Sequence, residues 1–142
     1  MFDLKYIIEN SGDSTFESYS YSKGLLTVSL FISDLEKKIT IKVRTNFLSF
    51  NNYYLQKSED LYRTCHIEIK ELHKVLKIHN NIYIPSDNFG IFMKEKKLNY
   101  NLAYGILASE NKYLLSITGY ADLVSCVVSG LENIIIDEDI ND

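Results

Sequence analysis

Two neighbouring stretches of the chain alternate between apolar and polar side chains, and this pattern constrains the fold more than any other feature. The stretches cover residues 26–32 and 39–43, and a polar connection, 33–38, separates them. A period of two puts one set of side chains on a core and the other set in water. We therefore expect an antiparallel β-meander with one solvated face. Its core-facing residues are Leu26, Val28, Leu30, Ile32, Ile39, Ile41 and Val43.

Further strands are expected on both sides of this meander. They cover residues 16–22, 62–67, 82–84, 89–93, 100–106 and 113–117. Lys23-Gly24 offers a turn between the first of them and the meander, because glycine adopts the left-handed backbone conformation that tight turns need. The last two alternate with a clean period of two and are expected to pair as a hairpin. Residues 51–54, which have no clear period, predict a loop with exposed aromatic side chains.

Two stretches have the spacing of an amphipathic helix. The first, near residues 69–77, has the apolar stripe Ile69, Leu72, Val75 and Leu76. The second covers residues 123–135, where apolar side chains recur at intervals of three, four, seven and eight. β-branched residues at 127–128 and 134–136 favour strands there instead. We expect a C-terminal helix, because the apolar stripe persists for three turns.

The length of the chain and its composition predict one domain. A chain of 142 residues is the size of a single ordinary domain, and proline occurs once, with no linker-like stretch. We therefore expect one α+β domain over residues 1–142. Its antiparallel sheet has about six or seven strands, with a short middle helix and a C-terminal helix packed on it. Residues 137–142 are expected to be an acidic, frayed tail.

The charge distribution along the chain is more informative than its net value of −4. Residues 1–36 have six acidic and two basic side chains, residues 37–109 have twelve basic and six acidic, and residues 110–142 have seven acidic and one basic. The chain is therefore acidic, then basic, then acidic. A solvated end explains the acidic C-terminus, and an acidic surface that meets a basic partner is the functional alternative.

No motif of a known catalytic or nucleotide-binding site occurs in the sequence. The phosphate-binding patterns GxxxxGK[ST] and GxGxxG are absent, and so are the GxSxG nucleophile elbow, CxxC and HExxH. Paired carboxylates occur on stretches that we expect to be polar faces, loops or the tail, where solvated charge is a better interpretation than a general acid or base in a desolvated cleft. We therefore expect neither enzymatic activity nor a cofactor.

The histidines and cysteines predict neither a metal site nor a catalytic thiol. His66, His73 and His79 lack the spacing that ligands need on a helix or a strand. Cys65 precedes His66 on an expected strand, so the two side chains point to opposite faces and cannot easily form a nucleophile–base pair. Together with Cys126, Cys65 is expected to be a plain buried thiol.

Nucleic-acid and membrane partners are also disfavoured. The chain is acidic, has only two arginines and lacks an RNA-binding signature, although Lys94, Lys96 and Lys97 lie near aromatic residues. Its apolar runs are too short to span a bilayer. The N-terminus has no apolar segment of a secretion signal, which predicts a cytoplasmic location.

Tyrosine is the most unusual component of the sequence. The chain has eleven tyrosines and seven phenylalanines but no tryptophan. Tyrosine suits protein interfaces, because its ring buries a large area while its hydroxyl keeps a hydrogen bond. An AT-rich genome, which favours Tyr, Ile, Asn and Lys codons, is an alternative explanation for part of the excess.

The order of elements resembles that of small bacterial immunity proteins, the antidotes of polymorphic or contact-dependent growth-inhibition toxins. The stretches that carry the resemblance are 67–72, Tyr104-Gly105-Ile106-Leu107, Tyr120-Ala121-Asp122-Leu123 and Gly130-Leu131-Glu132. They look like a strand leading into a helix, a closing strand, an acidic helix start and a terminal helix. The likeness covers roughly residues 16–136 and is one of layout rather than of a diagnostic motif.

This resemblance implies a function and a set of contacts. The chain would bind its cognate toxin and cover or distort the toxin's active site. Such toxins are often basic nucleases. An acidic antidote would associate with them faster, because the charges of the two proteins are complementary. The candidate contact residues are Glu17, Asp34, Glu36, Tyr53, Tyr54, Asp137, Glu138 and Asp139. A structural or regulatory protein-binding subunit, or a small enzyme without a recognisable motif, remain the alternatives.

Overall fold

Neighbouring strands in the described part of this protein run antiparallel. The computed structural model describes residues 3–45, 48–72 and 112–138, and within these ranges eight strands form one sheet in the order β4-β7-β6-β5-β1-β2-β3-β8. The strands are β1 Ser14–Ser22, β2 Leu25–Ile32, β3 Lys37–Arg44, β4 Leu48–Phe50, β5 Thr64–Glu71, β6 Lys112–Gly119, β7 Asp122–Ser129 and β8 Ile134–Glu138. The helices are α1 Leu4–Glu9, α2 Asn52–Leu55 and α3 Asp60–Arg63, with 3-10 turns η1 Ser33–Leu35 and η2 Leu131–Asn133.

The predicted meander is confirmed as β1, β2 and β3. Its predicted core-facing residues are all 2% exposed or less, whereas the intervening side chains face outward or are half-buried. Lys23 and Gly24 form the β1–β2 turn, and both have a positive φ (53° and 79°). Two such residues in succession match the right-handed twist of a tight hairpin.

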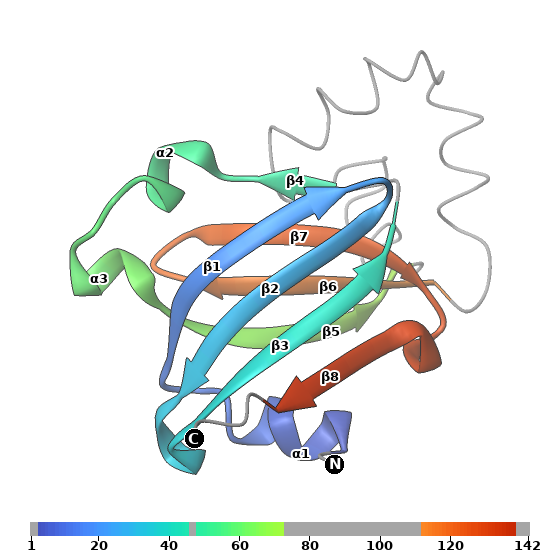
Figure 1. Cartoon of the computed structure of the whole chain (residues 1–142), viewed down its shortest axis with the longest axis horizontal. Helices are drawn as coiled ribbons and strands as arrows, with labels where there is room; N and C mark the ends of the chain where they lie inside the picture. Colours follow the sequence, from blue (N-terminus) through green and yellow to red (C-terminus); the bar gives the residue numbers. More distant parts are fainter. Residues whose placement is uncertain (1–2, 46–47, 73–111, 139–142) are drawn as a thin grey trace.

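The sheet is bent so strongly that its two halves face each other. In Figure 1, β1, β2 and β3 cross over β5, β6 and β7, while β8 lies beside β3 and α1 lies at one end. Only two residue pairs, Ser14–Cys65 and Thr15–Thr64, join β1 to β5 in the ladder. One core cluster includes residues of both halves together with Ile7 of α1, which is fully buried. The core therefore lies between the halves of a single folded-over sheet.

The prediction of a C-terminal helix is wrong, because residues 122–138 form β7, the turn η2 and β8. All residues from Leu123 to Val128 are 5% exposed or less, so β7 is buried on both faces. A strand buried on both faces has a continuous apolar run without alternation, and such a run also satisfies helical spacing. The β-branched residues Val127, Val128 and Ile134 favour the extended form that the structure has.

The middle of the chain departs from the sequence-based prediction in two ways. Strand β5 continues to Glu71, so the predicted helix does not begin at Ile69. Strand β6 confirms the strand expected at 113–117, but it pairs with β5 on one side and β7 on the other. The expected hairpin with 100–106 is therefore wrong. The rest of the predicted helix and the strands at 82–84, 89–93 and 100–106 lie outside the described residues.

Candidate protein-binding surface

Four tyrosine rings meet at one end of the folded sheet. Tyr54 of α2 contacts Tyr53, Tyr62 of α3 and Tyr120 of the β6–β7 turn, with ring centroids 5.0, 5.4 and 5.6 Å away. Tyr62 and Tyr120 also contact each other edge to face, at 5.1 Å. Offset and edge-to-face pairs of this kind are favourable beyond the area that they bury. The rings therefore hold three separate segments of the chain in one arrangement.

Helix α2 is fixed to the sheet at its start. Asn51 donates its backbone N–H to the carbonyl oxygen of Leu123, next to the β4–β7 pairing, at 2.9 Å. The Asn51 side chain accepts a hydrogen bond from the backbone N–H of Tyr54, at 3.3 Å, and so caps the helix. These two hydrogen bonds of Asn51 fix the start of α2 and thereby the positions of Tyr53 and Tyr54.

Helix α3 is joined to β1 through an arginine. The Nη1 of Arg63 donates a hydrogen bond to the backbone oxygen of Phe16, at 3.2 Å. The β1–β2 register shifts between Phe16 and Ser18, so Glu17 is the extra residue of a β-bulge. Glu17 is exposed and directly follows Phe16, the residue that Arg63 of α3 contacts.

Gly119 allows the β6–β7 turn to approach the beginning of β5. A Cβ atom at this position would lie 2.1 Å from the backbone oxygen of Thr64, which is inside any possible contact distance. Glycine is therefore required by the close approach of two backbones. The turn that follows presents Tyr120 next to α2 and α3.

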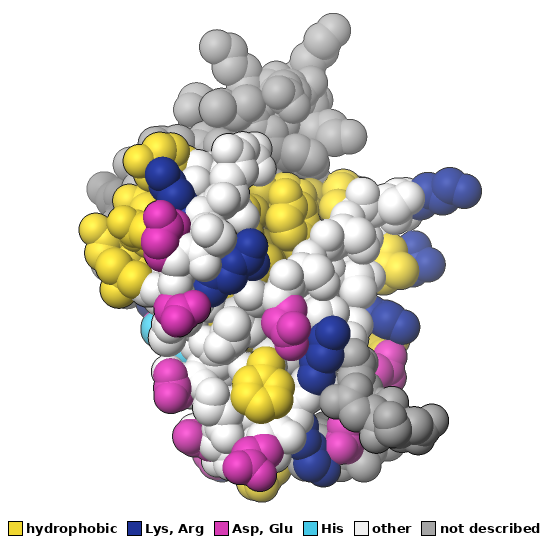
Figure 2. All heavy atoms as spheres, turned by 60° about the vertical axis from the view of Figure 1, so that its left-hand side comes forward, with side chains coloured by type: hydrophobic (Ala, Val, Ile, Leu, Met, Phe, Trp, Pro, Cys, Tyr) yellow, Lys and Arg dark blue, Asp and Glu magenta, His cyan; other side chains and the backbone are white. Residues whose placement is uncertain are grey.

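Three of the side chains at this end are largely exposed although they are apolar or aromatic. Tyr53, Leu61 and Tyr120 are 65%, 59% and 60% exposed. We call these residues together with Tyr54 and Tyr62 the aromatic surface. Figure 2 shows hydrophobic side chains gathered over α2 and α3, with acidic and basic groups around them. Exposed aromatic groups concentrated in one place are typical of a protein-interaction site.

A second row of rings continues from this end along β1. Phe50 of β4 contacts Tyr19 and Tyr21 of β1, with centroids 4.8 and 6.5 Å apart. Tyr21 donates its hydroxyl hydrogen to the backbone oxygen of Thr45, at 2.7 Å. This row connects the β1 side of the aromatic surface to a pocket at the β1–β2 turn.

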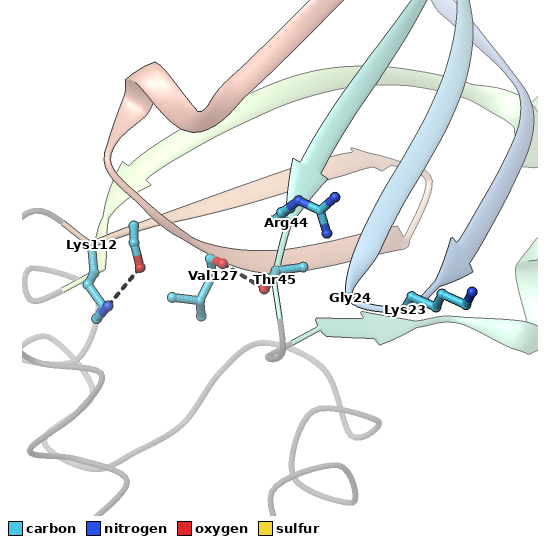
Figure 3. A pocket seen from close by; sticks show the side chains of 7 residues that line it. Lys23, Gly24, Arg44, Thr45, Lys112 and Val127 are labelled. Carbon is cyan, nitrogen blue, oxygen red and sulfur yellow. Dashed lines mark hydrogen bonds between the residues drawn. The ribbon is translucent and has the colours of Figure 1, made fainter.

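That pocket has a volume of about 380 Å³ and is lined by Lys23, Gly24, Arg44, Thr45, Lys112, Val127 and Ser129. We call it the basic pocket, since the charged side chains among these described lining residues are all cationic. Figure 3 shows Arg44 and Lys112 on opposite sides of Thr45 and Val127, while the Lys23 side chain extends outward from the turn.

The remaining predicted contact residues lie elsewhere. Asp34 belongs to η1 and Glu36 follows it with a φ of 51°, at the opposite end of the β1–β2 hairpin from the basic pocket. Asp137 and Glu138 belong to β8, where they form ion pairs with Lys42 (3.2 Å) and Lys37 (2.8 Å) of β3. Asp139 lies outside the described residues. The structure thus brings together Tyr53 and Tyr54, and it places Glu17 next to Phe16, which Arg63 of α3 contacts. The acidic residues Asp137 and Glu138 lie apart from them on β8.

Tyr62, Tyr120 and Leu61 of the aromatic surface were missed by the sequence-based prediction. The high tyrosine content does not indicate which rings meet in the fold. Tyr120 was assigned to the start of a helix, and Tyr62 to a strand. The one sequence signal for this turn is Gly119 directly before Tyr120, because glycine is common in tight turns.

The surroundings of the described histidine and of the two cysteines indicate structural roles for these side chains. Both thiols are free and at most 1% exposed, and burial raises the pKa of Cys65 and of Cys126 to about 12. His66 is hydrogen-bonded to Glu68 at 3.0 Å. Within the described ranges, no group of three or more His, Cys, Asp or Glu side chains could hold a metal ion. None of the helices there is long and apolar enough to cross a bilayer.

The described residues form a small antiparallel β-domain with exposed aromatic rings at one end. No family model and no solved structure matches the chain. The chain is 32% identical over 124 residues to immunity protein RhsIC of Dickeya dadantii (strain 3937), and the match covers 87% of this chain and 85% of that protein. The chain therefore belongs to the family of bacterial immunity proteins that includes RhsIC. The predicted family is confirmed, whereas the terminal helix that formed part of the layout resemblance is wrong, because residues 122–138 form β7, η2 and β8.

Proposed function

We propose that this protein binds a cognate bacterial toxin through the aromatic surface and neutralises it by covering or distorting the toxin's active site. Membership in the immunity-protein family supports the toxin as partner. The exposure of Tyr53, Leu61 and Tyr120 on three different segments supports the surface. The protein acts in the cytoplasm by binding and not by catalysis.

The aromatic surface suits tight binding because it is formed before the partner arrives. Tyr54 touches three other rings, and Asn51 anchors its helix to the sheet. Side chains that are already held in place lose little conformational entropy on binding. Tyrosine at the centre of an interface is a frequent source of binding energy. We therefore assign the main contacts to Tyr53 and Tyr120, with Leu61 beside them.

The acidic groups around the aromatic surface favour a partner with basic groups, as a nuclease has, although Lys57 also lies there, over the Tyr53 ring. Glu17, Glu59 and Asp60 are exposed near α3. Complementary charge speeds association and selects the correct partner. The predicted contacts Asp137 and Glu138 are already paired with lysines of β3, so we assign them no direct role in binding.

Co-expression with a toxin tests this function. An immunity gene is expected directly downstream of its toxin gene, so the partner to use is the toxin from the neighbouring gene, in a catalytically inactive form. We expect the two proteins to co-purify as a stoichiometric complex, and the immunity protein to abolish the activity of the active toxin. Failure to form a complex, or a complex in which the toxin stays fully active, would refute the proposal.

A further inference from the structure

We propose that the basic pocket binds an oxyanion, and that in the complex this is a carboxylate side chain of the toxin. The inference rests on the proposed toxin binding, and it adds the chemistry of one contact. It also gives the interface two charged ends of opposite sign, with acidic groups near α3 and basic groups at the β1–β2 turn.

The cations of the basic pocket have unused hydrogen-bonding capacity. Lys112 donates to the hydroxyl oxygen of Ser129 at 2.8 Å, and an ammonium group has further N–H donors beyond the one used here. Arg44 presents the planar donor fork that matches a carboxylate or a phosphate. Among the described residues, neither Lys23, Arg44 nor Lys112 forms an ion pair, and no acidic side chain lines the pocket.

The floor of the pocket is rigid. Thr45 is 7% exposed, and its hydroxyl donates to the backbone oxygen of Val127 at 2.7 Å. The backbone oxygen of Thr45 accepts the Tyr21 hydroxyl, and its N–H donates to the backbone oxygen of Gly24 at 2.9 Å. Arg44 directly precedes Thr45, so its backbone position is fixed by these bonds. In Figure 3, Arg44 lies on one side of this floor, with its guanidinium extending away from Lys112, and Lys112 lies on the other side, bonded to Ser129.

A carboxylate from a protein partner fits this pocket better than a nucleic acid. The chain has a net charge of −4, and a nucleic-acid backbone would be repelled by most of its surface. The hydrogen bond between Tyr21 and Thr45 joins the pocket to the ring row, and Tyr19 of that row contacts Phe16, the residue that Arg63 holds. A partner seated on the aromatic surface would therefore reach the pocket along β1. Opposite charges at the two ends would fix its orientation.

Charge reversal in the basic pocket tests whether the toxin group that binds there is negatively charged. We expect Arg44→Glu and Lys112→Glu each to raise the Kd for the inactive toxin about tenfold or more, because each places a carboxylate against the toxin's carboxylate. Lys5→Glu is the matched control, since it changes the net charge equally at an exposed position of α1 and should have little effect. Unchanged or tighter binding by both pocket variants, relative to Lys5→Glu, would overturn the inference.

Inorganic phosphate tests the pocket without the toxin. In NMR titrations of the free protein, we expect phosphate to shift the backbone amides of Thr45, Lys112 and Ser129 in a saturable way, and Arg44→Glu to remove these shifts. Chloride at the same ionic strength should not produce them. Absence of saturable shifts would overturn the anion site even if the toxin binds. Saturable shifts would support the site even if the neighbouring toxin does not bind, and that outcome would refute only the proposed function.

Discussion

The rings of Tyr54 and Tyr120 meet edge to face, with an interplanar angle of 62° and centroids 5.6 Å apart. Tyr54 belongs to α2, next to the edge strand β4, and Tyr120 belongs to the turn between β6 and β7. This contact joins a helix to a turn that is distant from it in sequence. The shape of the aromatic surface therefore depends on Tyr54, which is itself only half-buried.

Replacing Tyr54 should destabilise the fold, whereas replacing its exposed neighbour should not. We expect Tyr54→Ala to lower the free energy of unfolding by about 1–3 kcal/mol, because it removes three ring contacts and leaves a gap under the surface. Tyr53→Ala should change it by less than about 0.5 kcal/mol, since the side chain is 65% exposed. Urea unfolding followed by circular dichroism measures both. Equal losses for the two variants would contradict the supporting role of Tyr54.

Gly119 should be intolerant of even a methyl group. We expect Gly119→Ala to cost about 1–3 kcal/mol, because the new Cβ would lie 2.1 Å from the Thr64 backbone oxygen and the two strands would have to separate. Gly12→Ala is the control, as a Cβ there has no neighbour within 4 Å. Urea midpoints of the two variants give the comparison, and a Gly119→Ala protein as stable as Gly12→Ala would show that this backbone approach is looser than described.

Sequence patterns predict the strands that have one solvated face. They fail for β7, which is buried on both faces. β2 and β3 alternate cleanly because water covers their outer sides. β7 is buried on both faces, so its apolar run has no alternation to detect and also satisfies a helical stripe. The short helices α2 and α3 were missed because each has only four residues and depends on tertiary contacts, such as the bond from Arg63 to Phe16.

The candidate surface was predictable only in part for a similar reason. Composition indicated that tyrosines matter, and the loop at 51–54 was expected to expose them. Which rings meet is decided by long-range pairing, since β4 pairs with β7 and thereby brings α2 to Tyr120. The acidic C-terminus suggested a contact surface, but strand pairing places Asp137 and Glu138 against lysines of β3. Charge along a sequence does not show which charges are neutralised in the fold.

Both cysteines should be inert in the folded protein. Burial raises the pKa of each thiol from 9.0 to about 12, so almost no reactive thiolate exists at pH 8. We expect a thiol-reactive disulfide reagent to modify neither Cys65 nor Cys126 on the timescale of minutes. Modification of both should become rapid in denaturing urea. Rapid modification of either thiol under native conditions would contradict their burial.

Glu68 should titrate below its ordinary pKa. The hydrogen bond from His66 lowers this pKa, and the positive charge of Lys70 adds to the effect, while partial burial opposes it. A carboxyl whose folded pKa is depressed stabilises the fold above the ordinary value of 4.5, and that contribution is lost as the pH falls through the lower folded pKa. We expect NMR titration to show the low value, and His66→Ala to raise it. A Glu68 pKa that His66→Ala leaves unchanged would rule out this cause.

The central claim is that the immunity protein meets its toxin through the aromatic surface, and isothermal titration with the inactive toxin tests it most directly. We expect Tyr120→Ala and Tyr53→Ala each to weaken binding by about 2 kcal/mol or more, as expected for tyrosines at the centre of an interface. Ile135→Ala is the matched control, because Ile135 is 54% exposed on β8, at the opposite edge of the sheet. Full affinity in both tyrosine variants, or a larger loss in Ile135→Ala, would contradict the assignment of the surface.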